Sequence, residues 1–356
     1  MKPLPLGATI GILGGGQLGR MLVMAAARLG YRSHVFAEGD TPAGRLADCR
    51  TDAAFGDRAA LRRFAQGCSV VTTEFENVPV AAIERIVDIV PVRPGRRALA
   101  VAQDRLVEKD FLVGLDLRTA RYRAVPNART FAAVLADIGT PAILKTRTLG
   151  YDGKGQVRIE DRAAAEGALA SLGGRPAVLE GVVAFEREIS VIVARNALGD
   201  VACYDPGENE HRDGILRRTR IPARITADED AEARRIAGRI VGALDYVGVM
   251  GVELFVCADG LRVNEIAPRV HNSGHWTEAG CAVDQFEQHV RAVAGLPLGG
   301  TIRHADVEME NLVGADLDRL PALLAAPNVR VHLYGKGVVR PGRKMGHANH
   351  VLPRRG

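Results

Sequence analysis

Residues 251–265 read GVELFVCADGLRVNE, in which two runs of β-forming residues flank a turn of Ala, Asp and Gly. A three-residue hairpin loop favours glycine at its third position, as here. The pattern therefore predicts a hairpin that pairs Cys257 with Leu261. In this register Glu253 and Glu265 lie opposite each other on one face, whereas a two-residue loop would put them on opposite faces.

Two carboxylates that face each other repel unless a cation lies between them. Proteins bind Mg²⁺ through one or two carboxylates, and water and phosphate oxygens complete its shell. We therefore expect Glu253 and Glu265 to be ligands of Mg²⁺, with Mn²⁺ as the alternative ion. A solvated hairpin face that tolerates the repulsion is the other interpretation. The polar stretch that follows, NEIAPRVHNSGHWT (264–277), favours a site, because Arg269 can brace a phosphate or carboxylate and His271 can titrate or form hydrogen bonds.

The composition indicates a folded protein of two or three domains. The chain has 356 residues, of which 47% are apolar and 25% charged, and this excludes a disordered chain. No apolar run reaches the roughly 18 residues of a membrane helix. The apolar start is interrupted by prolines and glycines, so we interpret it as a buried strand rather than a signal peptide. The five cysteines form no Cys-x-x-Cys pair, which argues against disulfides or a cysteine-ligated zinc site and favours the cytoplasm.

The net charge of +5 comes from the C-terminus. Residues 328–356 hold seven Lys or Arg and no Asp or Glu, so the rest of the chain has 40 basic against 42 acidic residues. A tail that binds nucleic acid is one interpretation. The stretch also contains a strand-like pattern at 329–334 and turn residues, so a local phosphate site is favoured.

The residue patterns divide the chain into a parallel α/β unit followed by an α+β unit. The first unit has strand patterns at 8–13, 31–36 and 70–73 and a helical pattern at 21–29. After about residue 100 the sequence predicts an antiparallel hairpin, a further strand and a helix that begins with the capping box of Thr226 and Glu229; these elements are 142–146 with 156–159, 187–195, and a helix from 227. Boundaries are expected near residues 100 and 300.

Two glycine-rich loops are candidate phosphate sites. GGGQLG (14–19) lies between a strand and a helix and, with Glu38, matches the dinucleotide fingerprint. The motif alone does not identify the ligand, because any phosphate can bind to free N–H groups at the start of a helix. A strand-to-helix turn that binds no ligand is the alternative interpretation. KTRTLGYDGKGQ (145–156) joins two strands and predicts a flap that covers phosphates, unless it is an ordinary surface hairpin.

These motifs together resemble the N5-carboxyaminoimidazole ribonucleotide synthetase family, ATP-grasp enzymes of purine biosynthesis. The resemblance runs nearly end to end and rests on GGGQLGRM (14–21), TTEFENVP (72–79), GYDGKGQ (150–156), NEIAPRVHNSGHWT (264–277), YGK (334–336) and RPGRKMGH (340–347). It implies a parallel α/β pre-ATP-grasp domain (1–100), a central ATP-grasp domain (101–300) with a flap subdomain (about 118–180), and a basic C-terminal segment (301–356) that packs on it.

The implied reaction joins bicarbonate to the amine of 5-aminoimidazole ribonucleotide, with ATP cleaved to ADP and phosphate through carboxyphosphate. A cytoplasmic homodimer that binds neither nucleic acid nor membrane is implied as well. Two rivals are a formate-dependent glycinamide ribonucleotide transformylase, which shares the ATP-grasp plan, and a non-catalytic dinucleotide sensor that uses residues 14–19 and Glu38.

The resemblance also assigns site residues. The ATP-binding residues would be Arg105, Lys145, Gly150, Tyr151, Asp152, Gly153, Lys154, Gly155, Gln156, Glu180, Gly181, Val182, Val183, Glu188, His211, Asn264 and Glu265. The ribonucleotide would be bound by Gly16, Gln17, Leu18, Glu74, Asn272, Ser273, Lys336 and Arg343. The residues at the reacting groups would be Tyr151, Asp152, Lys154, Arg269 and His271, and the metal ligands Glu253 and Glu265. Leu149 departs from the family, which usually has glycine there, and this is expected to stiffen the flap.

Overall fold

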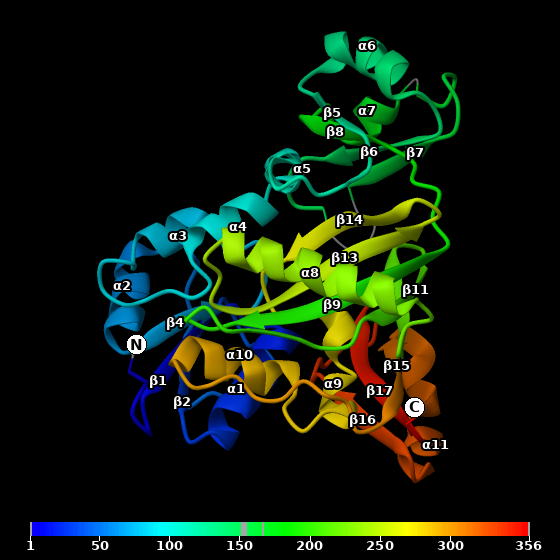
Figure 1. Cartoon of the computed structure of the whole chain (residues 1–356). Helices are drawn as coiled ribbons and strands as arrows, with labels where there is room; N and C mark the ends of the chain where they lie inside the picture. Colours follow the sequence, from blue (N-terminus) through cyan, green and yellow to red (C-terminus); the bar gives the residue numbers. More distant parts are fainter. Residues whose placement is uncertain (1, 151–154, 166, 355–356) are drawn as a thin grey trace.

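The computed structural model describes residues 2–150, 155–165 and 167–354. The described residues form three sheets, which Figure 1 shows in three regions of the molecule. The small four-stranded sheet within residues 122–181 lies at the top, the largest sheet lies in the middle, and the N-terminal sheet lies at the lower left. None of the described helices combines the length and the apolarity needed to cross a membrane.

The N-terminal unit has a parallel sheet, as predicted. Its strand order is β3-β2-β1-β4, and every pair is parallel. The elements are β1 (Thr9–Leu13), α1 (Gln17–Arg28), β2 (Arg32–Phe36), β3 (Cys49–Thr51), α2 (Arg58–Gln66), β4 (Val70–Thr73), α3 (Val80–Glu84) and α4 (Arg96–Ala102). Because the strands are parallel, the glycine loop after β1 and the residues after β4 meet at one edge of the sheet.

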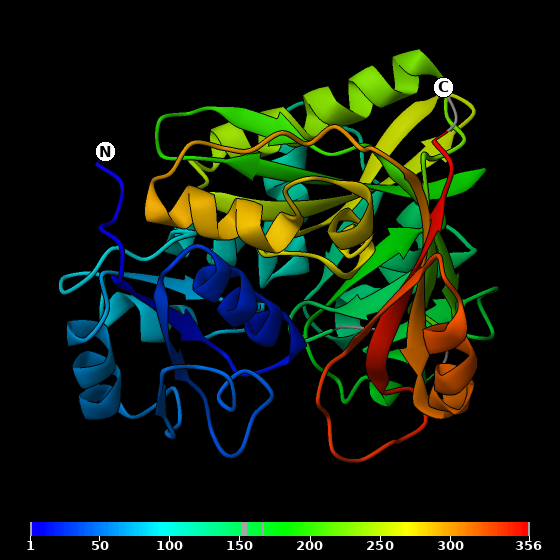
Figure 2. The ribbon, with the colours of Figure 1, turned by 90° about the horizontal axis from the view of Figure 1, so that it is seen from below.

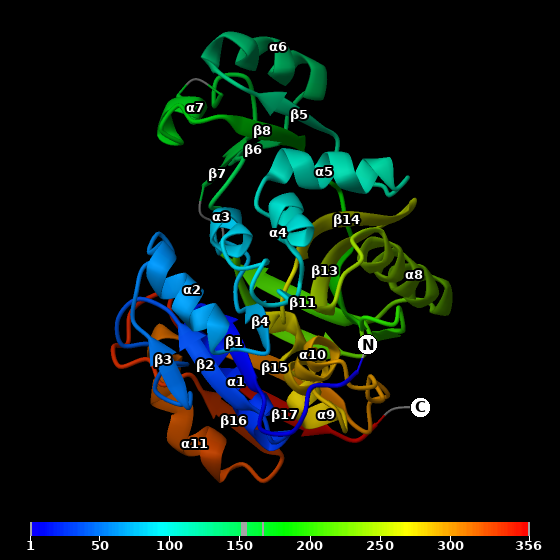
Figure 3. The same cartoon turned by 90° about the vertical axis from the view of Figure 1, so that its left-hand side faces the viewer.

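A small antiparallel sheet carries the second glycine loop. Its strand order is β5-β8-β6-β7, and the predicted hairpin of residues 142–146 with 156–159 is confirmed, with Lys145 paired to Gln156. The elements are β5 (Tyr122–Val125), α6 (Ala128–Ile138), β6 (Ala142–Thr146), β7 (Gln156–Ile159), α7 (Ala168–Ser171) and β8 (Ala177–Gly181). The helix α5 (Arg105–Gly114) leads from the N-terminal unit into this sheet (Figure 3).

The largest sheet is antiparallel and continues from the central part of the chain into the C-terminus. Its order is β14-β13-β9-β11-β12-β15-β17-β16, with β10 paired to β9. The strands are β9 (Arg187–Arg195), β10 (Val201–Cys203), β11 (Gly207–Arg212), β12 (Ile215–Ile221), β13 (Gly248–Cys257), β14 (Gly260–Ala267), β15 (Asp306–Val313), β16 (Val329–Leu333) and β17 (Lys344–Leu352). The helical segments are α8 (Ala227–Ala243), η1 (Asn272–Gly274), α9 (Thr277–Gly280), α10 (Gln285–Ala294), η2 (Gly314–Arg319) and α11 (Leu320–Ala325), and the capping box of α8 is present as predicted.

One hydrophobic core joins the N-terminal unit to the large sheet. It contains Leu22 and Ala26 of α1, Ile192 of β9, and Phe286 and Val290 of α10. Seen from below, α1 (blue) lies beside α10 (orange-yellow), and the C-terminal strands (red) lie to the right of both helices (Figure 2). The glycine loop that precedes α1 is therefore held in a fixed place relative to the large sheet.

The β13–β14 hairpin differs in one respect from its prediction. Cys257 pairs with Gly260 and not with Leu261, because Gly260, with a φ of +108°, already belongs to the ladder. The predicted three-residue loop is therefore wrong. The register shifts between Glu253 and Leu254, where Asn264 has no partner, and this bulge restores the predicted pairing of Glu253 with Glu265.

Candidate active site

Three residues of one turn of α5 hold the bulge that sets the carboxylate pair. The ammonium group of Lys109 donates to the carbonyl oxygen of Asn264 at 2.7 Å. The carboxyl group of Glu108 accepts from the N–H of Ile266 at 2.6 Å. Arg105 forms an ion pair with Glu265 at 3.2 Å. Positions 105, 108 and 109 lie on one face of the helix, so α5 contacts three consecutive residues of β14.

The carboxylate pair has the character of a cation site. Burial raises the pKa of Glu253 to about 7, and the facing Glu265 adds to the shift. The Glu265 side chain is 41% exposed, so a ligand can reach it from solvent. The two facing carboxylate groups offer hard oxygen ligands with excess negative charge, and Nδ2 of Asn264 lies 3.5 Å from Oε2 of Glu253. This donor set fits Mg²⁺.

The chain passes from β8 of the small sheet to β9 of the large sheet through a connection that starts near Glu180 and that we call the hinge. At this hinge, Glu180 lies between two lysines. Lys145 contacts its carboxylate at 2.9 Å and Lys109 at 3.6 Å. Burial alone would raise the pKa of Glu180, but the two ammonium groups lower it to about 2. The Oε1 atom of Glu180 is buried and has no hydrogen-bond partner among the described residues. A buried orphan acceptor is costly, so the hinge is suited to a ligand that donates an N–H here.

The next predicted pair, Glu188 and His211, lies on neighbouring strands of the large sheet. The carboxylate of Glu188 and Nδ1 of His211 are 2.5 Å apart. Burial alone would lower the pKa of His211, but the hydrogen bond to Glu188 raises it overall. The charge of His211 also acts on Glu253, where it opposes the rise in the pKa of that carboxyl group. The structure thus brings Glu188, His211 and the carboxylate pair into one neighbourhood.

Arg105 connects the carboxylate pair to the flap loop. One of its Nη atoms contacts Glu265, and the other donates to the carbonyl oxygen of Gly150 at 3.4 Å. Leu149 has a φ of +63°, a left-handed conformation that glycine adopts without strain. Gly155 lies against Thr146, whose Oγ1 would be 2.6 Å from an added Cβ. Tyr151, Asp152, Gly153 and Lys154 lie outside the described residues, so their predicted contacts stay predictions.

The N-terminal glycine loop is closed by a carboxylate of the protein itself. The two oxygens of Glu74 accept from the N–H groups of Gly16 and Gly19, both at 2.8 Å. An added Cβ at Gly14 would lie 2.3 Å from Glu74. The glycines are therefore required by the close approach of Glu74. Two N–H groups at the start of α1 are therefore occupied by a side chain of the protein, which argues against the sensor hypothesis.

The loop nevertheless meets the basic C-terminal segment. Lys336 donates to the side-chain oxygen of Gln17 at 2.6 Å, across 319 positions of sequence. Arg20, on the first turn of α1, has a buried Nε without a partner among the described residues. Leu18 is buried, and Arg343 donates to the carbonyl oxygen of Val338 at 2.9 Å. Lys336 thus lies at Gln17, and Arg20 lies beside Gly335, the residue before Lys336.

The polar stretch after β14 extends the site toward Glu74. Arg269 forms an ion pair with Glu76, and burial alone would raise the pKa of that carboxyl group, but Arg269 lowers it to about 2. His271 is buried, and its Nε2 lies 3.6 Å from Glu253. Burial, together with Arg269, holds the pKa of His271 well below its usual value.

Two of the predicted substrate residues are engaged within the protein. The amides of Asn272 and Asn311 exchange two hydrogen bonds, at 2.9 and 2.6 Å. The hydroxyl of Ser273 contacts His271 Nδ1 at 2.8 Å and the hydroxyl of Ser190 at 2.7 Å. These bonds fix the loop that carries His271.

Sequence reasoning did not single out Glu108, Lys109, Glu76 or Asn311. Lys109, Glu76 and Asn311 contact predicted site residues, whereas Glu108 contacts Ile266, the neighbour of Glu265. One signal was present in the chain: Arg105, Glu108 and Lys109 have the i, i+3, i+4 spacing that places three charges on one face of a helix.

Three family models match successive parts of the chain. They are the ribonucleotide synthetase preATP-grasp domain at residues 7–103, the ATP-grasp domain at 110–286, and the phosphoribosylaminoimidazole carboxylase C-terminal domain at 308–355. Together they confirm the predicted succession of a pre-ATP-grasp unit, an ATP-grasp unit and a C-terminal unit.

Relatives match over nearly the full length. An N5-carboxyaminoimidazole ribonucleotide synthase from Brucella melitensis is 51% identical over 99% of this chain and 98% of the relative. One from Pseudomonas aeruginosa is 42% identical over 95% of this chain and 93% of the relative.

Solved structures agree. The synthetase from Thermus thermophilus superposes with a TM-score of 0.90 at 43% identity, covering 98% of this chain and 94% of the other. The synthase from Aspergillus clavatus, in complex with ADP and 5-aminoimidazole ribonucleotide, gives 0.92 at 34% identity, with the same coverage. The resemblance in the sequence motifs is therefore confirmed, and the chain belongs to the N5-carboxyaminoimidazole ribonucleotide synthase family of ATP-grasp enzymes.

Proposed function

We propose that this chain carboxylates 5-aminoimidazole ribonucleotide with bicarbonate, cleaving ATP to ADP and phosphate, as a step of purine biosynthesis. The observation that carries the proposal is the end-to-end likeness to the Aspergillus clavatus synthase, which holds ADP and 5-aminoimidazole ribonucleotide. The convergence of Arg105, Glu265 and Gly150 supports it, because a nucleotide between flap and hairpin would meet all three.

ATP is proposed to lie between the small sheet and the hairpin. The unpartnered oxygen of Glu180 suits the exocyclic amine of adenine, and Gly181 to Val183 continue along the base. Glu188 is suited to the ribose hydroxyls. Lys145 and Arg105, with Lys154 and the other flap residues, would neutralise the phosphates.

Glu253 and Glu265, with Asn264 beside them, would hold Mg²⁺, or Mn²⁺ in its place. Bound there, the ion would spread the negative charge of the phosphates during transfer. The ion would also relieve the repulsion between the two facing carboxylates.

The reaction is proposed to start with attack of bicarbonate on the γ-phosphate, which forms carboxyphosphate. Arg105 and Arg269 would stabilise the developing negative charge. The amine of the ribonucleotide then captures the carboxyl group. His271 and Asp152 are the candidate proton acceptors, and closure of the flap would protect carboxyphosphate from water.

The ribonucleotide is proposed to lie between the N-terminal loop and the C-terminal segment. Gln17, Lys336 and Arg343 would bind its 5′-phosphate, since Lys336 contacts Gln17 and Arg343 belongs to the same basic segment. Glu74 would act mainly by fixing the loop from Gly16 to Gly19. We further propose a cytoplasmic homodimer without nucleic-acid or membrane partners.

The test is ADP release by the purified protein with Mg-ATP and 5-aminoimidazole ribonucleotide, with and without bicarbonate in CO₂-depleted buffer. Bicarbonate-dependent ADP release with matching loss of the free amine is expected. ADP release without loss of the amine would overturn the proposed acceptor, and formate would be tried next. A folded protein that binds ATP but releases no ADP would overturn catalysis itself.

A further inference from the structure

A second group of metal-binding side chains lies outside the site described above. Glu278 of α9, His332 of β16 and His347 of β17 direct one ligand atom each into a space in which all three atoms lie within 4.8 Å of one another. Within the described parts of the chain, no other group of His, Cys, Asp and Glu meets that condition. The three side chains come from separate elements that meet only in the folded protein.

The distances fit a small divalent ion. One oxygen of Glu278 lies 3.0 Å from Nε2 of His347, and the other lies 3.4 Å from Nδ1 of His332. Zinc binds imidazole nitrogen and carboxylate oxygen at about 2.0–2.1 Å, so neighbouring ligands on its tetrahedron are about 3.3 Å apart. The two histidine nitrogens lie within 4.8 Å of each other, so an ion can enter between the three groups once their side chains adjust to it.

The surroundings resemble those of built metal sites. The hydroxyl of Tyr334 lies 2.9 Å from Nδ1 of His347. Metal on Nε2 would put the ring proton on Nδ1, where the hydroxyl oxygen accepts it, and partners of this kind orient ligating histidines. His275 packs on His347 with ring centroids 4.6 Å apart, and its buried Nε2 has no partner in the described part of the chain.

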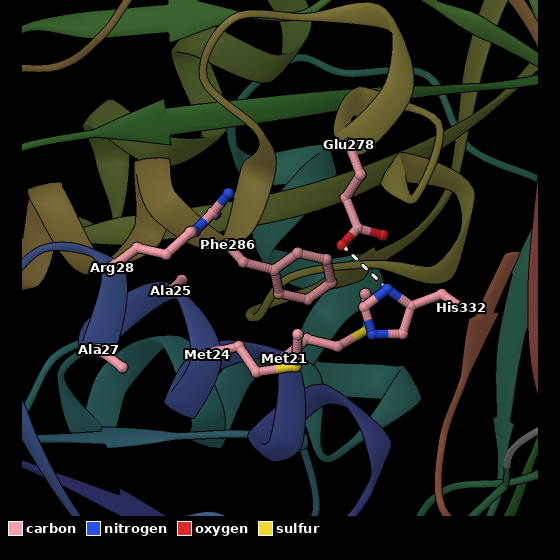
Figure 4. A pocket seen from close by; sticks show the side chains of 8 residues that line it. All are labelled: Met21, Met24, Ala25, Ala27, Arg28, Glu278, Phe286 and His332. Atoms are coloured by element: carbon pink, nitrogen blue, oxygen red, sulfur yellow. Dashed lines mark ion pairs between the residues drawn. The ribbon is translucent and has the colours of Figure 1, made fainter. Parts of the chain in front are cut away.

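The cluster can be reached from outside. A cavity of about 490 Å³ is lined by Glu278 and His332 at one end and by Met21, Met24 and Arg28 of α1 along its wall. Figure 4 shows Glu278 and His332 facing each other, with the methionine side chains below them. The cavity would give an ion an entry path and room for a water molecule at its fourth coordination position.

We propose that Glu278, His332 and His347 form a zinc site that ties the C-terminal strands β16 and β17 to α9. The site is separate from the carboxylate pair of the hairpin. It would fasten the segment that carries Lys336 and Arg343 to the loop that carries His271.

The test measures zinc binding by the full chain after chelator treatment, with excess Mg-ATP present to occupy the catalytic site. The wild type is expected to bind one equivalent of Zn²⁺, and its Co²⁺ form to show the visible absorption of a tetrahedral site. His332→Ala and Glu278→Gln should each weaken binding at least tenfold. The control is His350→Gln, which removes a histidine of β17 that pairs with Glu310 instead.

No zinc binding by the wild type would overturn the proposal, and so would equal binding by all four proteins. If His332→Ala does not fold, His332→Asn replaces it, since asparagine keeps a polar side chain at the half-buried position. Carboxylation is measured separately, so a negative zinc result leaves the proposed reaction untouched.

Discussion

Glu253 pairs with Glu265 across the β13–β14 hairpin, although the turn that joins their strands has the wrong length for it. A two-residue turn alone would place the two side chains on opposite faces. The bulge at Asn264 adds the missing residue. A local irregularity of one strand thus decides whether two carboxylates can share a cation.

Replacing Glu265 by Gln tests that pair directly. Glu265→Gln removes one charge from the proposed cation site and the partner of Arg105. We expect kcat to fall by at least about 100-fold and the Mg²⁺ concentration for half-maximal rate to rise. The readout is ADP release over a Mg²⁺ titration.

The control for that experiment is Glu186→Gln, an exposed carboxylate that pairs with Arg187. It should leave the titration unchanged. A near-normal kcat in Glu265→Gln would remove Glu265 from the metal site.

Lys109→Met tests whether α5 positions the bulge. The substitution removes the donor to the carbonyl of Asn264 and one of two cations beside Glu180. Loss of a buried ion partner costs about 3–5 kcal/mol, so the melting temperature should fall. We also expect kcat to fall at least about tenfold and the Mg²⁺ requirement to rise, because Glu265 is no longer held opposite Glu253.

The matched control is Arg118→Met. Arg118 contacts Asp259 in the turn at the other end of the hairpin, so this variant also removes a cation that touches the hairpin, but far from the carboxylate pair. It should leave kcat and the Mg²⁺ requirement unchanged. If Lys109→Met lowers stability alone, Lys109 supports the fold and does not position the pair.

The sequence predicted the fold well where hydrophobic pattern and turn residues act locally. The parallel strands at 8–13, 31–36 and 70–73, the flap hairpin and the capping box at Thr226 all follow from such signals. The pairing of Glu253 with Glu265 was predicted correctly from an incorrect loop. Nothing in the residue pattern marks a bulge at Asn264, because its cause is tertiary: Lys109 and Glu108 hold its backbone.

The glycine loop shows the same limit. GGGQLG (14–19) satisfies the dinucleotide fingerprint, yet the N–H groups of Gly16 and Gly19 bind Glu74, which is more than 50 positions away in the chain. The motif indicates that a negatively charged group approaches the N-terminus of the helix. Only the folded structure shows that this group is the carboxylate of Glu74. Likewise, the contact of Lys336 with Gln17 needs the C-terminal strands to be in place.

Glu108 predicts a pH dependence of stability. Burial, reinforced by the charge of Glu265, raises the pKa of Glu108 to about 8, from about 4.3 in the unfolded chain. The folded protein therefore holds this proton more tightly than the unfolded one. The stabilisation is complete below about pH 4 and is lost as the pH rises toward 8. Glu108→Gln keeps an acceptor for Ile266 and cannot ionise.

The measurement is the difference in melting temperature between wild type and Glu108→Gln from pH 4.5 upward to about 8. The wild type should lose stability relative to the variant across this range. A difference that does not change with pH would show that Glu108 is ionised in the folded protein.

Arg343→Ala and Lys336→Ala test where the ribonucleotide binds. Charge-assisted hydrogen bonds contribute about 1.5–3 kcal/mol, so loss of either cation should raise the KM for the ribonucleotide about ten- to a hundredfold. The KM for ATP should change little, because Lys336 lies at Gln17 and the proposed ATP residues lie at the hinge and the hairpin. The control is Arg340→Ala, an exposed residue of the same segment. A selective rise in the KM for ATP would move these cations to the nucleotide, and unchanged constants would place the 5′-phosphate elsewhere, with Arg20 as the next cation to replace.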